Sequence, residues 1–247
     1  MRTLIIIPTY NERENIAELL PRLLALPVTA EVLVVDDASP DGTAEEVQRW
    51  SREVPGRVHL LQRPAKLGLG SAYCQGFLWA LERSYEVLVQ MDADLSHDPN
   101  DVPRLIAALA TADVAIGSRY VSGVNVVNWP MGRLLLSWLA NRYTRWITGM
   151  PIADATSGFK AFRAHVLRRL RWERIRSNGY AFQIEVNYRL WRLGCRIVEV
   201  PIIFVDRRSG ISKLNRGIVY EAAWMVWRLR LSSLLRNETR YYTEDNC

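Results

Sequence analysis

The stretch VLVQMDADLSH, residues 87–97, is an apolar run that ends in two carboxylates separated by one residue. A buried strand of an α/β sheet reads as such a continuous apolar run. Ligands in these folds bind beyond the carboxyl ends of the strands. We therefore expect Asp92 and Asp94 to lie where a ligand binds.

Two carboxylates at this spacing predict a metal site. They repel each other unless a cation or several donors lie between them. Mg²⁺ or Mn²⁺ typically takes one or two carboxylates together with phosphate oxygens. The alternative is turn and capping chemistry, because Asp98 and Pro99 open the next expected helix and acidic residues gather at helix starts. The pair alone does not decide between the two interpretations.

Short apolar runs alternate with helical patterns on both sides of this stretch. The expected strands cover residues 3–7, 31–35, 58–62, 86–91 and 114–117. The expected helices lie near residues 15–26, 43–52, 70–83 and 99–111. This alternation predicts an α/β fold with a mostly parallel twisted sheet and helices on both of its faces.

The pattern changes after about residue 120. A loop at 122–128 leads into a tryptophan-rich helix near 131–148. The segments expected after it are a strand near 159–163, a helix near 182–193, a strand at 196–200, a polar loop at 206–213 and a helix near 218–235. Since no repeat or linker interrupts the chain, we expect one domain over residues 1–236 and a flexible tail at 237–247.

Charge also divides the chain near residue 120. Residues 1–120 carry 11 Lys and Arg against 17 Asp and Glu, whereas residues 121–247 carry 21 against 9. An acidic half joined to a basic half indicates two tasks. One is the holding of a metal, and the other is contact with an anionic partner such as phosphate, nucleic acid or a lipid surface.

Cysteine usage and hydropathy exclude several classes of protein. The three cysteines, Cys74, Cys195 and Cys247, are widely spaced, which argues against a disulfide framework or a zinc site and for a reducing compartment. No apolar stretch reaches the roughly 18 residues of a membrane span. The first residues lack the pattern of a signal peptide.

Polar residues follow the first two expected strands. PTYNE at 8–12 and VDDASPDGT at 35–43 place an aromatic ring and carboxylates at neighbouring strand ends. Such a set can stack on a base and accept hydrogen bonds from base and ribose. Turn chemistry is the competing interpretation, but Glu12 is not a turn residue, which favours nucleotide recognition.

A glycine-containing segment, KLGLGSAY at 66–73, precedes the third expected helix. Backbone N–H groups at a helix start, together with Lys66, can bind a phosphate. A tight turn into the helix explains the two glycines equally well.

Several motifs follow one another along the chain. They are PTYNE at 8–12, VDD at 35–37 with SPDGT at 39–43, DAD at 92–94, GSRY at 117–120, SGF at 157–159, and VDR at 205–207 with GISK at 210–213. Together they resemble family 2 glycosyltransferases, and among these the polyprenyl-phosphate (dolichyl-phosphate) mannose synthases. The resemblance implies a GT-A nucleotide-diphospho-sugar transferase fold. It also implies metal-dependent transfer of mannose from GDP-mannose to a polyprenyl phosphate, with inversion.

The resemblance implies roles for individual residues, most of them in the nucleotide-sugar half, residues 1–120. Asp94 would be the principal ligand of Mg²⁺ or Mn²⁺, with Asp92 beside it and Ser96 where some members place a glutamine ligand. The residues that would bind the nucleotide sugar are Pro8, Tyr10, Glu12, Val35, Asp37, Lys66, Asp92, Ala93, Asp94, Arg119, Arg207 and Lys213. Arg207 and Lys213 would neutralise the leaving group, and with Asp92 and Asp94 they form the expected catalytic set.

The other half, residues 121–236, would meet the acceptor. A phosphate monoester is largely a dianion at pH 7, so the reaction needs no general base. It needs a basic pocket, which we assign to Arg119, Arg133 and Ser137; the last two lie one helical turn apart.

A polyprenyl acceptor places the enzyme at a membrane. The stretch near 131–148 has the aromatic and basic composition of an interfacial helix, through Trp129, Trp138, Tyr143, Trp146, Arg133, Arg142 and Arg145. Residues 218–235 are a second candidate, with Trp224, Trp227, Arg228 and Arg230. Core packing is the competing interpretation for both. We expect a peripheral protein on the cytoplasmic face of a membrane, held by anionic lipid or a membrane-protein anchor.

Three other functions compete with this one. The first keeps the fold but transfers glucose from UDP-glucose to a polyprenyl phosphate. The second is a nucleic-acid-binding protein, suggested by a pI of 9.4, although no nucleic-acid-binding motif supports it and we expect no such partner. The third is a lipid-binding adaptor without catalytic activity.

Overall fold

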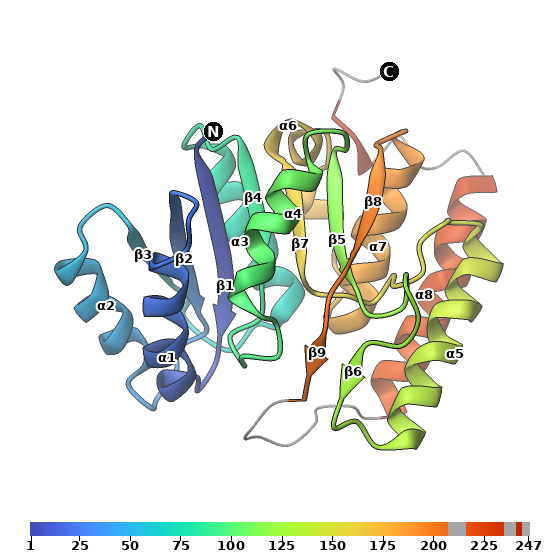
Figure 1. Cartoon of the computed structure of the whole chain (residues 1–247). Coiled ribbons are helices and arrows are strands. Elements are labelled where there is room, and N and C mark those ends of the chain that lie inside the picture. Colours follow the sequence, from blue (N-terminus) through green and yellow to red (C-terminus); the bar gives the residue numbers. More distant parts are fainter. Residues whose placement is uncertain (207–215, 235–240, 244–247) are drawn as a thin grey trace.

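A seven-stranded sheet with the order β3-β2-β1-β4-β7-β5-β8 forms the centre of the molecule (Figure 1). The computed structural model describes residues 1–206, 216–234 and 241–243. The strands of this sheet are β1 (Thr3–Thr9), β2 (Ala30–Asp36), β3 (Val58–Gln62), β4 (Val87–Gln90), β5 (Val114–Ser118), β7 (Lys160–Arg163) and β8 (Ile197–Pro201). Its neighbours pair in parallel except β7, which is antiparallel to β4 and β5. The predicted α/β fold with a mostly parallel sheet is confirmed.

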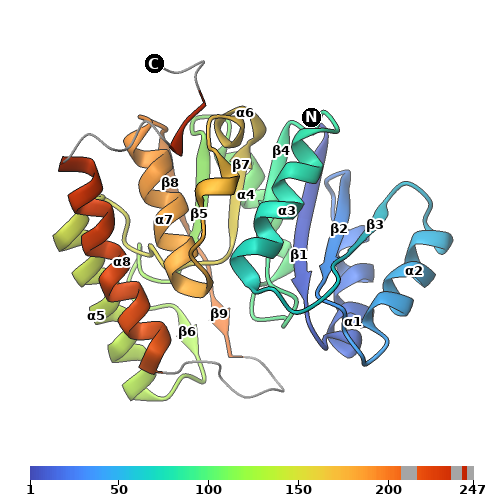
Figure 2. The ribbon, with the colours of Figure 1, turned by 180° about the vertical axis from the view of Figure 1, so that it is seen from behind.

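Helices cover both faces of the sheet. They are α1 (Arg13–Leu24), α2 (Thr43–Glu53), α3 (Leu69–Leu81), α4 (Val102–Ala108), α5 (Met131–Thr148), α6 (Ala164–Arg168), α7 (Gly179–Arg192) and α8 (Arg216–Leu234), with short 3₁₀ turns η1 (Pro99–Asp101) and η2 (Trp172–Arg174). Leu4 and Ile6 of β1 face the core beneath α3 and α7, whereas Ile5 and Ile7 face α1 and α4. This alternation follows from the two-residue period of a strand and gives the sheet two buried faces, seen in Figures 1 and 2.

Helices α5 and α8 lie side by side beyond the β8 end of the sheet (Figures 1 and 2). Helix α8 also packs against α7, which joins the pair to the rest of the molecule. Among the described residues, no helix has both the length and the apolar composition that crossing a membrane requires.

Two features of the fold differ from the sequence-based expectation. Strand β7 was expected, but its antiparallel insertion between β4 and β5 was not, because an apolar run carries no information about strand direction. A second sheet pairs β6 (Val126–Val127) with β9 (Phe204–Val205) in parallel, and two-residue strands leave no periodic pattern. The expected polar loop at 206–213 lies outside the described residues after residue 206.

Candidate active site

A cavity of about 320 Å³ opens beyond the carboxyl ends of β1, β2, β4 and β5. Parallel strands bring their carboxyl ends to one edge, so motifs far apart in the sequence meet there. The predicted site residues that line the cavity are Pro8, Tyr10, Glu12, Asp37, Lys66, Asp92, Ala93, Asp94, Ser96, Arg119 and Arg133.

Of the predicted site residues that the structure describes, Val35 and Ser137 are not in the cavity wall. The side chain of Val35 is fully buried in the core beneath α3, so only its backbone is available to a ligand. Ser137 instead accepts a hydrogen bond from the hydroxyl of Tyr120 at 2.8 Å. Arg207 and Lys213 lie outside the described residues, and their roles stay predictions.

The carboxylates of Asp92 and Asp94 are held by neighbouring groups. The Tyr73 hydroxyl donates to Asp92 Oδ1 at 3.0 Å. A Cβ at Gly158 would lie 3.1 Å from Asp92 Oδ2, so the glycine makes room for this carboxylate. Asp94 Oδ1 accepts from the hydroxyl of Ser96 at 2.5 Å and from its backbone N–H at 3.2 Å. The Ser96 hydroxyl therefore orients Asp94, and a ligand role for its oxygen stays a prediction.

The donor set suits a divalent ion that is shared with a substrate. The described residues contain no group of three or more His, Cys, Asp or Glu side chains able to hold a metal. Asp92 and Asp94 offer hard oxygen donors at the cavity, so further ligands must come from the bound molecule. Mg²⁺ and Mn²⁺ bind in this way, through one or two carboxylates and phosphate oxygens, so the residues fit such an ion.

Asp37 presents a buried acceptor on the other side of the cavity. Its Oδ2 accepts from the backbone N–H groups of Leu67 and Gly68 at 3.1 and 3.3 Å. Its Oδ1 lies 3.0 Å from Arg63 Nη1, but the contact lacks hydrogen-bond geometry. No described residue donates a hydrogen bond to this oxygen. Because Oδ1 is buried and receives no such bond, it is suited to accept one from an N–H group of a bound base.

Close packing explains the two glycines at the start of α3, Gly68 at its N-cap and Gly70 in its first turn. A Cβ at Gly70 would lie 2.3 Å from the carbonyl oxygen of Ser177. Gly68 has a φ of +98°, and a Cβ there would lie 2.8 Å from Asn178 Oδ1. The backbone N–H of Gly70 donates to this same Oδ1 at 3.1 Å. The structure thus favours the turn interpretation of this segment over a phosphate-binding one.

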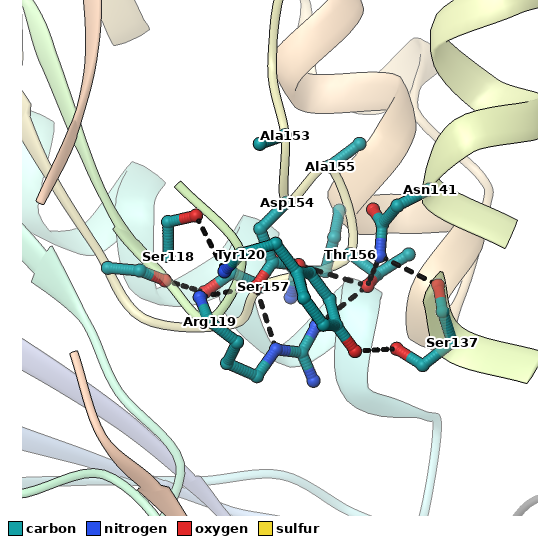
Figure 3. A network of polar contacts seen from close by, with 12 residues as sticks. Ser118, Arg119, Tyr120, Ser137, Asn141, Ala153, Asp154, Ala155, Thr156 and Ser157 are labelled. Atoms are coloured by element: carbon teal, nitrogen blue, oxygen red, sulfur yellow. Dashed lines mark hydrogen bonds and ion pairs between the residues drawn. The ribbon is translucent and has the colours of Figure 1, made fainter. Parts of the chain in front are cut away.

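A buried ion pair supports the opposite wall (Figure 3). Arg119 Nε and Nη2 donate to the two carboxylate oxygens of Asp154 at 2.7 and 2.6 Å, and Nη2 also donates to Thr156 Oγ1 at 2.8 Å. Asn141 of α5 donates to Thr156 Oγ1 as well, at 3.2 Å. The sequence analysis assigned Arg119 to substrate phosphates and missed Asp154, which balances its charge. Arg119 therefore also fixes the loop before β7.

Arg133 lines the cavity and lies beside Asp206, the last residue of the described segment 1–206. Its Nη1 donates to Asp206 Oδ1 at 2.8 Å, and its guanidinium lies 4.2 Å from the centre of a Trp129 ring. Trp129 in turn meets the Phe204 ring edge-on, with 5.4 Å between ring centres. Arg133 thus lines the cavity and Trp129 packs against it, and their place in the expected interfacial stretch stays a prediction.

Two buried bases near the acidic pair have lowered pKa values. Burial lowers the pKa of His97 to about 4, so its ring is neutral at pH 7; its Nδ1 accepts from the backbone N–H of Asp92 at 3.3 Å. Burial also lowers the pKa of Lys160 to about 7, although Asp154 and Asp92 oppose this shift. Desolvation disfavours the charged form of a base, which accounts for both directions.

Replacing Tyr73 with phenylalanine is expected to lower kcat/KM for sugar transfer about tenfold with little loss of stability. The change removes the hydroxyl that orients Asp92 but keeps the ring stacked on Phe182. Tyr188→Phe is the matched control, because its buried hydroxyl has no hydrogen-bond partner among the described residues. Steady-state rates of the two variants check the prediction, and equal rates would contradict it.

Exposed apolar side chains gather on the outer helix pair. Trp146 of α5 is 80% exposed and Trp224 of α8 is 69% exposed. The others with large exposed fractions are Met131, Leu135, Leu136, Trp138, Leu139, Trp227 and Leu231. Tyr143, expected on this face, is half-buried and packs against the core. We call the exposed set the α5/α8 apolar face.

Comparison with known proteins identifies the family. A family model described as Glycosyl transferase family 2 matches residues 4–171. Over 233 residues the chain is 50% identical to an undecaprenyl-phosphate mannosyltransferase from Micrococcus luteus, covering 94% of this chain and 96% of that protein. Over 232 residues it is 47% identical to a polyprenol monophosphomannose synthase from Mycolicibacterium smegmatis, covering 93% and 88%. The chain belongs to the family 2 glycosyltransferases, as its motifs implied.

Solved glycosyltransferase structures share the fold. Glucosyl-3-phosphoglycerate synthase from Mycobacterium tuberculosis, in complex with Mn²⁺, UDP and glucosyl-3-phosphoglycerate, has a TM-score of 0.63 at 19% identity, covering 98% of this chain and 81% of that one. A mannosyltransferase from Pyrobaculum calidifontis, in complex with GDP-Man and Mn²⁺, has a TM-score of 0.56 at 18% identity, covering 95% and 74%. At such identities the likeness concerns the fold alone, and it confirms the GT-A arrangement.

Proposed function

We propose that this enzyme transfers mannose from GDP-mannose to a polyprenyl phosphate, with inversion and with the help of Mg²⁺ or Mn²⁺. The observation that carries the proposal is a single cavity that joins the base-side acceptor Asp37, the acidic pair Asp92 and Asp94, and the cation of Arg133. The two relatives with 50% and 47% identity are named for mannosyl transfer to such lipid phosphates.

Each part of the cavity has a task in this reaction. Asp37 accepts from the guanine, and Asp94 holds the ion at the diphosphate. When bound there, a divalent ion would supply positive charge against the diphosphate of the leaving GDP. Arg133 receives the acceptor phosphate in place of Asp206, and this phosphate attacks as a dianion without a general base.

The α5/α8 apolar face gives the proposed enzyme a membrane-facing surface. Exposed tryptophans beside arginines suit the headgroup region of a bilayer, and Arg142 lies 5.0 Å from the Trp138 ring. Helix α5 also carries Arg133 at the cavity, so one helix links the surface to the acceptor end of the site. We infer a peripheral protein of the cytoplasmic face that reaches its lipid acceptor from this surface.

The experiment that tests the donor assignment is a transfer assay with two nucleotide sugars. GDP-mannose and UDP-glucose are each offered with a short and a long polyprenyl phosphate. We expect transfer from GDP-mannose to dominate with both acceptors. Preferential transfer from UDP-glucose would contradict the assignment of GDP-mannose as the donor. No transfer from either nucleotide sugar would contradict the proposed function.

Replacing Trp146 with serine is expected to weaken binding to vesicles of anionic phospholipid about tenfold, because each buried tryptophan contributes on the order of 2 kcal/mol. Leu78→Ser is the control, since Leu78 is 45% exposed but lies on α3. Sedimentation with vesicles measures the binding. Equal binding of the two variants would contradict the assignment of the α5/α8 apolar face.

A further inference from the structure

A buried polar chain runs from the sheet to the cavity. Lys160 at the start of β7 is fully buried, and its Nζ donates to Gln183 Oε1 at 2.8 Å and to the Gln183 carbonyl oxygen at 3.4 Å. Gln90, paired with Lys160 in the β4–β7 register, donates through Nε2 to the same Oε1 at 2.8 Å. Gln183 is 2% exposed and lines the cavity.

These contacts decide which way the Gln183 amide points. Lys160 Nζ carries hydrogens to donate in either protonation state, and it lies within hydrogen-bond distance of the Gln183 carbonyl oxygen, which can only accept; Gln90 Nε2 donates to the same side-chain oxygen of Gln183. The oxygen of Gln183 must therefore face Lys160, which places its NH₂ group on the other side, toward the cavity. In the part of the chain that the structure describes, no atom accepts a hydrogen bond from this NH₂ group.

Gln183 and Asp92 both line the cavity, so its wall offers a donor and an acceptor. Gln183 supplies N–H groups, and Asp92, two residues beyond Gln90 in the chain, supplies carboxylate oxygens. Adjacent hydroxyls of a sugar can both donate and accept, so they match this pair. A diphosphate has only acceptors at its oxygens, so it could meet Asp92 only through a bound cation.

We propose that Gln183 binds the hexose of the nucleotide sugar by donating from Nε2 to a hydroxyl oxygen, and that Lys160 is the positioning residue that holds the amide in this orientation. The inference rests on the proposed function, because it takes GDP-mannose as the donor. The proposal adds Gln183 of α7, as a residue that determines sugar specificity, to a site otherwise formed by motifs at strand ends.

Two variants of Gln183 test the proposal. Gln183→Met removes the donor and the acceptor, whereas Gln183→Glu keeps an acceptor for Lys160 and Gln90 but replaces the donor with a carboxyl oxygen. Gln75→Met is the matched control, since Gln75 is exposed on α3. For each protein, calorimetry measures the Kd of GDP, and transfer assays measure kcat/KM for GDP-mannose and for analogues that each lack one hydroxyl.

We expect both Gln183 variants to lose at least tenfold in kcat/KM for GDP-mannose while the Gln183→Met variant keeps its Kd for GDP within twofold. With the wild type, one deoxy analogue should have a much lower kcat/KM than GDP-mannose. With Gln183→Met, the two donors should have similar kcat/KM values. A loss of GDP affinity in Gln183→Met as large as its loss in kcat/KM would overturn the proposal. An unchanged kcat/KM would overturn it as well. A wild-type protein that does not use GDP-mannose at all would instead overturn the proposed function.

Discussion

Replacing Asp94 with asparagine is expected to lower kcat/KM for sugar transfer about 10³-fold. Asparagine keeps the shape of the side chain and an oxygen that can accept from Ser96, but it lacks the charge that holds a divalent ion. Without that ion, the negative charge that develops on the departing diphosphate is poorly stabilised. Initial rates at several Mn²⁺ concentrations measure the loss, which added metal should restore only in part.

Asp98→Asn is the control for this change. Asp98 is exposed in the same loop, and its side chain accepts from the backbone N–H of Asn100, a capping contact that asparagine also makes. Its rate should stay within about twofold of the wild type. An Asp94→Asn variant that keeps more than about a tenth of wild-type activity would contradict the metal-holding role of Asp94.

Replacing Asp154 with alanine is expected to lower the free energy of unfolding by about 3–5 kcal/mol. The change leaves the guanidinium of Arg119 buried without its counter-charge, and Thr156 alone cannot compensate it. Urea unfolding at pH 7 measures the loss. The exposed ion pair of Glu53 with Arg49 is the control, and Glu53→Ala should cost less than about 1 kcal/mol.

The Asp154 contribution should depend on pH in one direction. Burial alone would raise the pKa of Asp154, but the charge and hydrogen bonds of Arg119 outweigh it and lower this pKa in the folded protein. The stabilisation is therefore complete above the ordinary aspartate value of about 3.9 and is lost as the pH falls through the lower folded value. A difference between wild type and Asp154→Ala that grows as the pH falls below about 4 would contradict this account.

The sequence predicted those parts of the fold that long apolar runs define. Strands β1, β2 and β4 carry such runs, and polar motifs stand directly after them, so the parallel arrangement brings these motifs to one edge. Strand direction and pairing order depend on contacts between distant segments. The antiparallel place of β7 between β4 and β5 was therefore missed.

Several site residues were missed for the same reason, because their positions depend on contacts between distant segments. Asp154 and Lys160 flank the SGF motif, but only the insertion of β7 brings Lys160 opposite Gln90, and only folding brings Asp154 to Arg119. Tyr73 looks like a core residue of an apolar helix, and its hydroxyl contact with Asp92 leaves no pattern in the sequence. Val35 was expected at the nucleotide, and because its side chain lies in the core, that role stays a prediction for its backbone alone.

The measurement that tests the central claim most directly is the transfer of labelled mannose from GDP-mannose to a polyprenyl phosphate, with the lipid product isolated and its anomeric configuration determined. Wild-type enzyme is assayed with Mn²⁺, with a chelator, and with the chelator followed by excess Mn²⁺. The account predicts inverted, β-configured mannosyl lipid that disappears with the chelator and returns with the metal. Undiminished transfer in the chelator, or product that retains the configuration of the donor, would contradict it.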